Sequence, residues 1–211
     1  MSNDLPRRGV CLVLAAPSGA GKSTIARALR AREAGLVNSI SVTTRAPRPG
    51  EQEGVDYFFR TADQFAAMAA AGEFVEWATV FDRSYGTPRA LVEQALAAGH
   101  DMIFDIDWQG YQQLRAAMPD DVVGLFILPP SLDELRRRLQ GRGTDDAEVI
   151  ETRMTKALAE ISHWREFDHV LVNDDLTDAI DHAHAVLIAA RCAVARQTGF
   201  ATLGFEISAS S

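Results

Sequence analysis

The chain has 211 residues, of which 47% are hydrophobic and 24% are charged, a balance typical of one soluble α/β domain with small insertions. The formal net charge of -8 argues against a broad nucleic-acid-binding surface, although a local anion site needs only a few arginines. No apolar run approaches a membrane span, and the opening residues MSNDLPRRG lack the apolar core of a secretory leader. With two cysteines far apart, Cys11 and Cys192, these features predict a cytoplasmic protein without nucleic-acid or membrane partners.

Four continuous apolar runs predict strands that are buried on both faces, at residues 10–15, 102–106, 122–128 and 169–172. Apolar residues at helical spacing predict helices at residues 23–32, 90–98, 131–140, 147–164 and 178–196. Gly99 follows the second helix as a C-cap glycine, and Ser131 with Glu134 has the spacing of a capping box at the third. Strands that alternate with helices predict a parallel sheet covered on both sides.

Two segments break this alternation. Residues 39–87 are rich in Thr, Pro and Phe and contain short alternating runs, which predicts a small α+β insertion with one helix at residues 62–71. Residues 141–152 are polar and flanked by glycine, which predicts a mobile lid. The core would then comprise residues 9–38, 88–140 and 153–195, with residues 1–8 and 196–211 as tails.

The stretch AAPSGAGKST, residues 15–24, has the strand–loop–helix context of a phosphate-binding loop. Backbone N–H groups of such a loop form an anion nest, Lys22 can reach the β- and γ-phosphates, and Ser23 offers a hydroxyl to Mg²⁺. Ala16 replaces the usual first glycine, but a methyl group is the smallest possible intrusion. We therefore expect ATP to be bound by Ala16, Pro17, Ser18, Gly19, Ala20, Gly21, Lys22, Ser23 and Thr24.

Two carboxylates end an apolar run in MIFDID, Asp105 and Asp107. A spacing of two places both side chains on one side of a strand, and unpaired buried charge is too costly to serve packing alone. One of the two should therefore assist the metal of a bound nucleotide. We favour Asp105, because it comes first at the end of the run, while a pair of solvated acids is the alternative.

Arg45 and Arg48 lie three residues apart in the Pro- and Thr-rich loop SVTTRAPRPGE. Arginine forks match phosphate oxygens with two parallel hydrogen bonds, so the pair could hold the phosphate of an acceptor substrate. Tyr57 and Tyr85 could add hydroxyl donors. Taken alone, the segment is equally compatible with a solvated basic loop.

Seven motifs taken in chain order closely resemble those of guanylate kinases: APSGAGKST, SVTTRAPRPGE-x-x-G-x-DY, FVEWA, YGTP, DIDWQG, RLQGRGT and VNDD. The resemblance covers roughly residues 10–190. Each motif beyond the phosphate loop is weak evidence by itself, but all seven in this order along the chain are strong evidence. It implies a P-loop nucleoside monophosphate kinase fold with a GMP-binding insertion and a helical lid. It also implies transfer of the γ-phosphoryl group of ATP·Mg to GMP or dGMP in purine nucleotide metabolism.

The resemblance further implies the roles of individual residues. The phosphate of GMP would be held by Arg45, Arg48, Tyr57 and Tyr85, and its guanine by Ser41, Glu76, Thr87 and Asp107, with Gly86 beside them. The charge on the transferred group would be stabilised by Lys22, Arg45, Arg138, Arg142 and Arg153, and the adenine of ATP would contact Asn173. Without the resemblance, Glu76 would be interpreted as the polar side of an alternating strand.

Three other functions are compatible with parts of the sequence. A kinase of sugar phosphates would share the loop and sheet but would not need Ser41, Glu76 and Thr87. A peptide-binding scaffold domain would not need Lys22 or the lid arginines. A P-loop ATPase would carry a catalytic acid next to Asp105, where the chain has isoleucine. The oligomeric state, monomer or homo-oligomer, stays open.

Overall fold

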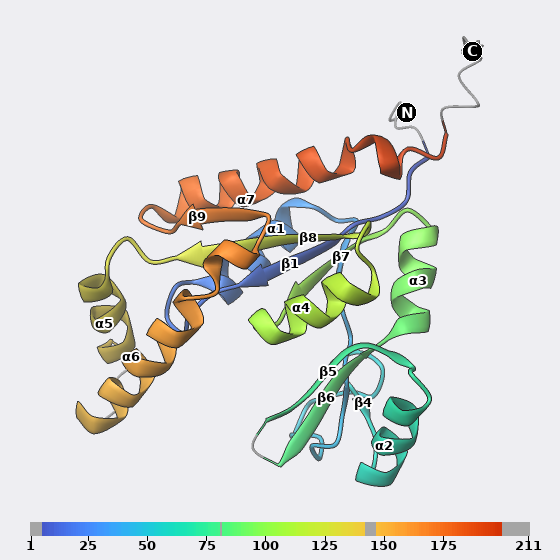
Figure 1. The fold of residues 1–211 in the computed structure, drawn as a ribbon, viewed down its shortest axis with the longest axis horizontal. Coiled ribbons are helices and arrows are strands. Elements are labelled where there is room, and N and C mark those ends of the chain that lie inside the picture. The colour runs from blue at the N-terminus through green and yellow to red at the C-terminus, as the bar shows by residue number, and fades with distance from the viewer. Residues whose placement is uncertain (1–5, 81, 142–146, 200–211) are drawn as a thin grey trace.

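The computed structural model describes residues 6–80, 82–141 and 147–199, which form a five-stranded sheet and a smaller four-stranded sheet with helices around them (Figure 1). The larger sheet has the order β2 (Leu36–Asn38), β7 (Asp101–Asp105), β1 (Cys11–Ala15), β8 (Val122–Leu128) and β9 (His169–Val172). Every neighbouring pair in it is parallel, and Val13 lies opposite both Phe104 and Gly124. The parallel sheet predicted from the apolar runs is confirmed.

Helices cover both faces of this sheet because alternate residues of β1 point to opposite sides. Leu12 and Leu14 belong to one core cluster, which is closed by α1 (Lys22–Arg32) and α7 (Leu176–Arg191). Cys11 and Val13 belong to a second cluster, which is closed by α3 (Arg89–Ala97) and α4 (Trp108–Ala117). The carboxyl ends of the strands stay open for the loops that follow them.

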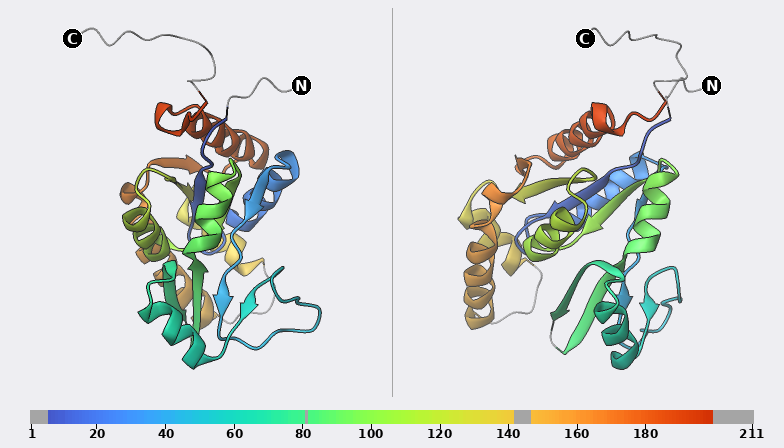
Figure 2. Two further views of the ribbon diagram at one scale, coloured as in Figure 1. Left: turned by 90° about the vertical axis from the view of Figure 1, so that its right-hand side faces the viewer. Right: turned by 45° about the vertical axis from the view of Figure 1, so that its right-hand side comes forward.

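The insertion forms the four-stranded sheet, whose order is β4 (Phe58–Phe59), β3 (Val42–Thr43), β6 (Arg83–Pro88) and β5 (Phe74–Val80). Its single helix, α2 (Ala62–Ala70), begins at a capping box between Thr61 and Gln64 and packs Phe65 on Phe74. Figure 2 shows this unit beside the open edge of the core. Trp77 of β5 donates its backbone N–H to the side chain of Gln113 on α4 at 3.0 Å, which ties the insertion to the core.

A pair of helices, α5 (Leu132–Gln140) and α6 (Ala147–Ile161), extends from the opposite side of the core (Figure 1). Ser131 caps α5 by accepting from the backbone N–H of Glu134. The Glu134 carboxylate, however, accepts from Arg137 and Arg138, so the predicted capping box is only half formed. Residues 147–152, half of the predicted lid, are the first turns of α6. Arg142 lies outside the described residues.

Several predicted boundaries were wrong. The last two helices end at Ile161 and Arg191, each followed by a short 3-10 turn, Trp164–Glu166 and Val194–Arg196. The helix α4 and the three-residue strand β2 were not predicted. Asp107 caps α4 rather than ending a strand, so it and Asp105 do not share one strand face.

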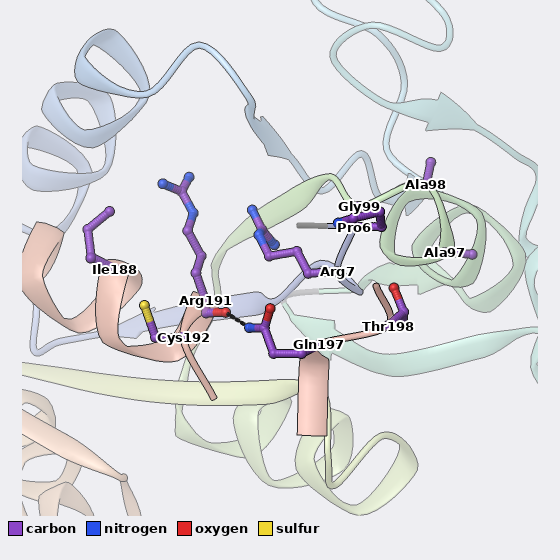
Figure 3. A pocket seen from close by; sticks show the side chains of 10 residues that line it. All are labelled: Pro6, Arg7, Ala97, Ala98, Gly99, Ile188, Arg191, Cys192, Gln197 and Thr198. Atoms are coloured by element: carbon purple, nitrogen blue, oxygen red, sulfur yellow. Dashed lines mark hydrogen bonds between the residues drawn. The ribbon is translucent and has the colours of Figure 1, made fainter. Parts of the chain in front are cut away.

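Both predicted tails contact the core within the described residues. Arg7 makes two hydrogen bonds to Asp101, at 2.6 and 2.8 Å, because this buried carboxylate needs a counter-charge. Arg196 is buried and donates to the backbone carbonyl of Gly9 at 2.9 Å. A cavity of about 720 Å³ lies beside these segments, at the amino ends of the strands, and Arg7, Gly99, Arg191 and Gln197 are among its lining residues (Figure 3).

Among the described residues, no helix combines the length and apolar character that crossing a bilayer would require.

Candidate active site

The phosphate loop connects the carboxyl end of β1 to the start of α1. Gly19 and Gly21 have φ angles of 94° and 102°, which side chains rarely adopt. A Cβ atom on Gly21 would lie 2.3 Å from the side-chain nitrogen of Asn173. Both glycines are therefore required by the turn, and the loop lines a cavity of about 290 Å³ together with Asp107 and Glu160.

Asn173 follows β9 and is buried against this loop. Its Nδ2 donates to the backbone carbonyl of Ala20 at 2.7 Å, so the amide helps to hold the loop in shape. Arg138 of α5 donates to the backbone carbonyl of Asn173 at 3.1 Å, and both residues line a second cavity beside Gly19 and Gly21. The predicted contact of Asn173 with adenine stays a prediction, now beside a role in positioning the loop.

Three polar groups meet where α1 begins. The Nζ of Lys22 lies 2.7 Å from Oδ1 of Asp105 and donates to the backbone carbonyl of Ile106 at 3.1 Å. The hydroxyl of Ser23 donates to Oδ2 of the same carboxylate at 3.2 Å. The structure thus brings Asp105 to the loop, and its role at the metal stays a prediction.

Ala16 occupies an ordinary backbone conformation. Asp82 is the one non-glycine residue with a positive φ in the described parts of the chain, so the position of Ala16 does not demand glycine. Its methyl group packs partly buried against the core cluster of β1 and α1. Alanine at this position is therefore compatible with the backbone conformation of the loop.

We expect Ala16→Gly to leave kcat/KM for both substrates within about twofold of the wild type and to lower the free energy of unfolding by about 0.5–1 kcal/mol. Glycine gains freedom in the unfolded chain and loses the packed methyl group. Steady-state kinetics and urea unfolding test both statements. A tenfold rise in activity would show instead that the methyl group obstructs the loop.

A buried carboxylate lies in the insertion, on β5. Glu76 is 7% exposed and accepts a hydrogen bond from the hydroxyl of Thr87 on β6, 2.5 Å away. Burial raises the pKa of Glu76, the bond from Thr87 opposes this shift, and the charge of Asp107 adds to it. Asp107 also lines the cavity of the phosphate loop, so one residue relates the two halves of the site.

The aromatic and arginine residues predicted to hold a phosphate lie together in the insertion. The guanidinium of Arg45 is 5.3 Å from the ring centre of Tyr57, whose ring is 6.1 Å from that of Tyr85. Arg45 is held by two hydrogen bonds to Glu51, at 3.0 and 2.7 Å. The backbone N–H of Arg48 donates to Glu51 at 2.7 Å, and the charge of its exposed side chain acts on the same carboxylate.

A cavity of about 420 Å³ separates the core from the insertion. Ser41 and Tyr57 line it from the insertion, and Ser23 and Asp105 line it from the core. Gly86 packs close to Trp77 and Phe74, where a Cβ atom would lie 2.9 Å from that of Trp77. Ser23 lines both this cavity and that of the phosphate loop, so the two cavities adjoin at the start of α1.

Sequence reasoning missed one residue of this region. Glu160 of α6 approaches the loop, and its Oε2 accepts from the backbone N–H of Ser18 at 3.3 Å. It lies 142 residues from its partner, and no local pattern marks it. Its helical spacing of seven from Arg153, which places both on one face of α6, was the available signal.

Comparisons with known proteins agree with this geometry. The sequence profile of the family described as guanylate kinase matches residues 8–190. The chain is 67% identical over 193 residues to a guanylate kinase of Gluconobacter oxydans, covering 92% of this chain and 93% of that protein. It is 60% identical to one of Granulibacter bethesdensis, covering 90% and 89% of the two chains. The crystal structure of guanylate kinase from Anaplasma phagocytophilum superposes with a TM-score of 0.73 at 38% identity, covering 94% and 95%.

Proposed function

The chain belongs to the guanylate kinase family, and from this premise we propose which residues carry the transfer of the γ-phosphoryl group of ATP to GMP. The chain is a nucleoside monophosphate kinase rather than a sugar kinase or a peptide-binding module. One observation carries the proposal. A cavity of about 420 Å³ is lined by Ser41 and Tyr57 of the insertion and by Ser23 and Asp105 of the core, so the donor and acceptor half-sites adjoin.

The donor half-site is the loop at the start of α1. Its backbone N–H groups bind the phosphates of ATP, and the positive end of α1 adds to their attraction. Lys22 neutralises the negative charge on the transferring phosphoryl group. Its ion pair with the Asp105 carboxylate holds the Lys22 side chain in position for this role. Arg138 and Arg153 add positive charge from α5 and α6.

The residues at the loop suit Mg²⁺ brought with ATP. A hard cation takes oxygen ligands, and the Ser23 hydroxyl and the Asp105 carboxylate already lie within 3.2 Å of each other. We propose that these two residues hold the ion, Asp105 through its carboxylate. Bound there, Mg²⁺ would offset the negative charge on the β- and γ-phosphates.

The acceptor half-site reads guanine through its buried carboxylate. Guanine presents N1–H and an exocyclic amine on one edge, and Glu76 can accept from both while Thr87 orients it. Ser41 and Asp107 complete the contacts to the base. Arg45, Arg48, Tyr57 and Tyr85 bind the phosphate of GMP.

The transfer itself requires little more than alignment. An oxygen of the GMP phosphate attacks the γ-phosphorus of ATP, a new P–O bond forms, and the bond to the β-phosphate oxygen breaks, giving GDP and ADP. The acceptor phosphate is already nucleophilic at neutral pH because its second pKa is about 6. No side chain therefore has to act as a strong base.

A substrate panel tests this proposal. ADP release should follow addition of GMP or dGMP and not of AMP, CMP or UMP, since none of the assigned contacts involves the ribose 2′-hydroxyl. Release without any acceptor would indicate an ATPase, and turnover of dGMP below about 1% of GMP would contradict the assigned contacts. We also infer a cytoplasmic location, because buried Cys11 and exposed Cys192 are both unpaired.

A further inference from the structure

We propose that Glu160 is a positioning residue whose carboxylate accepts from the phosphate-binding amide of Ser18 and is displaced when ATP binds. The proposal rests on the proposed assignment of the loop to ATP. Its starting observation is the hydrogen bond from the Ser18 N–H to Oε2 of Glu160, 3.3 Å long. An amide of an anion nest here has a carboxylate of the same chain as its partner.

The surroundings of Glu160 make this contact specific. The carboxylate lines the cavity of the loop, and its neighbours there include one acid, Asp107, and one cation, Lys22. Lys156, one turn earlier on α6, is a second cation near it. Burial raises the pKa of Glu160 above its ordinary value with a smaller contribution from Asp107, and the Ser18 N–H and the two lysines oppose this shift only in part. Glu160 is therefore a group whose interactions change directly when phosphates enter the loop.

The helix that carries Glu160 is fixed on the loop by packing as well. Met154 and Ala157 of α6 belong to a core cluster with Leu135 and Leu139 of α5. The same two leucines approach Gly19, where a Cβ atom would lie 3.2 Å from each. If the Glu160 carboxylate moves away from Ser18, the movement is therefore passed to α5 and α6, which pack together beside the loop.

Displacement would couple nucleotide binding to the lid arginines. A triphosphate repels the Glu160 carboxylate and attracts the guanidinium of Arg153, which lies two turns away on the same face of α6. Both forces act on one rigid helix. A carboxylate of the chain and a phosphate of ATP thus compete for one amide of the loop, and ATP must replace the carboxylate to bind.

Glu160→Gln removes the charge but keeps an acceptor for the Ser18 N–H. We expect its Kd for ATP and for ADP to fall about tenfold, with the Kd for GMP unchanged. Isothermal titration with each nucleotide measures these constants. Glu148→Gln, an exposed position on the same helix, is the matched control and should bind all three like the wild type.

Glu160→Ala, which removes both charge and acceptor, should also bind ATP more tightly than the wild type, and alanine preserves the helix. A purely structural role for Glu160 predicts the opposite, weaker binding by both variants. Equal or weaker ATP binding by both variants, in a protein whose wild type binds ATP and phosphorylates GMP, overturns the inference. Failure of the wild type to bind ATP would instead refute the assignment of the loop.

Discussion

Glu76→Gln is expected to lower kcat/KM for GMP by about 100-fold or more. A carboxylate accepts from both guanine donors, whereas glutamine offers one acceptor and turns an N–H group toward the other donor. The same amide can donate to the N1 acceptor of adenine, so the variant should also use AMP better. The ratio of kcat/KM for GMP to that for AMP should therefore fall by a larger factor than kcat/KM for GMP. Initial rates with both nucleotides measure this ratio.

The same substitution should make the free protein more stable at neutral pH. Burial raises the pKa of Glu76 in the folded state. A raised carboxyl pKa contributes stability that is complete below the unfolded value, about 4.3, and is lost as pH rises through the folded value. Wild type and variant should therefore unfold alike near pH 4, and the variant should unfold at the higher urea concentration at pH 7.

Glu73→Gln provides the matched control, because Glu73 is exposed and lies three residues earlier in the same segment. It should change neither the GMP preference nor the pH dependence of stability. If Glu76→Gln kept the full activity with GMP, the guanine edge would have to be read elsewhere. If Glu76→Gln were less stable than the wild type at pH 7, burial of the Glu76 charge would not be destabilising.

The elements that the sequence predicted best are those with a strong local pattern. The apolar runs of β1 and β8 appear as strands because a covered parallel sheet needs apolar residues on both faces. The run of β9 also forms a strand, but it lies at the edge of the sheet and exposes Val170 and Val172, so the prediction that it is buried on both faces was wrong. The helix α4 was missed although Tyr111 and Leu114 are buried at helical spacing and Asp107 caps its start. Polar residues separate the few buried positions of α4, because its other face is exposed to solvent. The apolar pattern of the helix is therefore weak.

Contacts between residues that lie far apart in the sequence were not predicted, because no local pattern indicates them. Nothing near Arg7 in the sequence indicates that Asp101 will be buried and will need its charge. Glu160 is similar, because its partner Ser18 belongs to a loop at the other end of the chain. Motifs with fixed spacing located Lys22 and Ser23, whereas residues that act across the fold required the coordinates.

Lys22→Met is expected to lower kcat by about 10³-fold while leaving the Kd for GMP unchanged. Methionine keeps the length of the side chain and removes the charge that faces the transferring group. The charge matters most when negative charge moves toward the β-phosphate, so the loss should appear in kcat more than in the KM for ATP. Quenched-flow measurement of a single turnover isolates this step from product release.

The contacts of Asp105 add a second effect of the Lys22→Met substitution. Lys22 and Ser23 both contact this carboxylate, so removing the ammonium also deprives Asp105 of its ion-pair partner. Arg32→Met, at the far end of α1, removes a positive charge that is paired with Asp181 and should leave kcat unchanged. An equal loss in both variants would assign the effect to the helix rather than to the ammonium group. A loss confined to Lys22→Met, together with normal GMP binding, would place the catalytic charge at the loop and the recognition of guanine in the insertion.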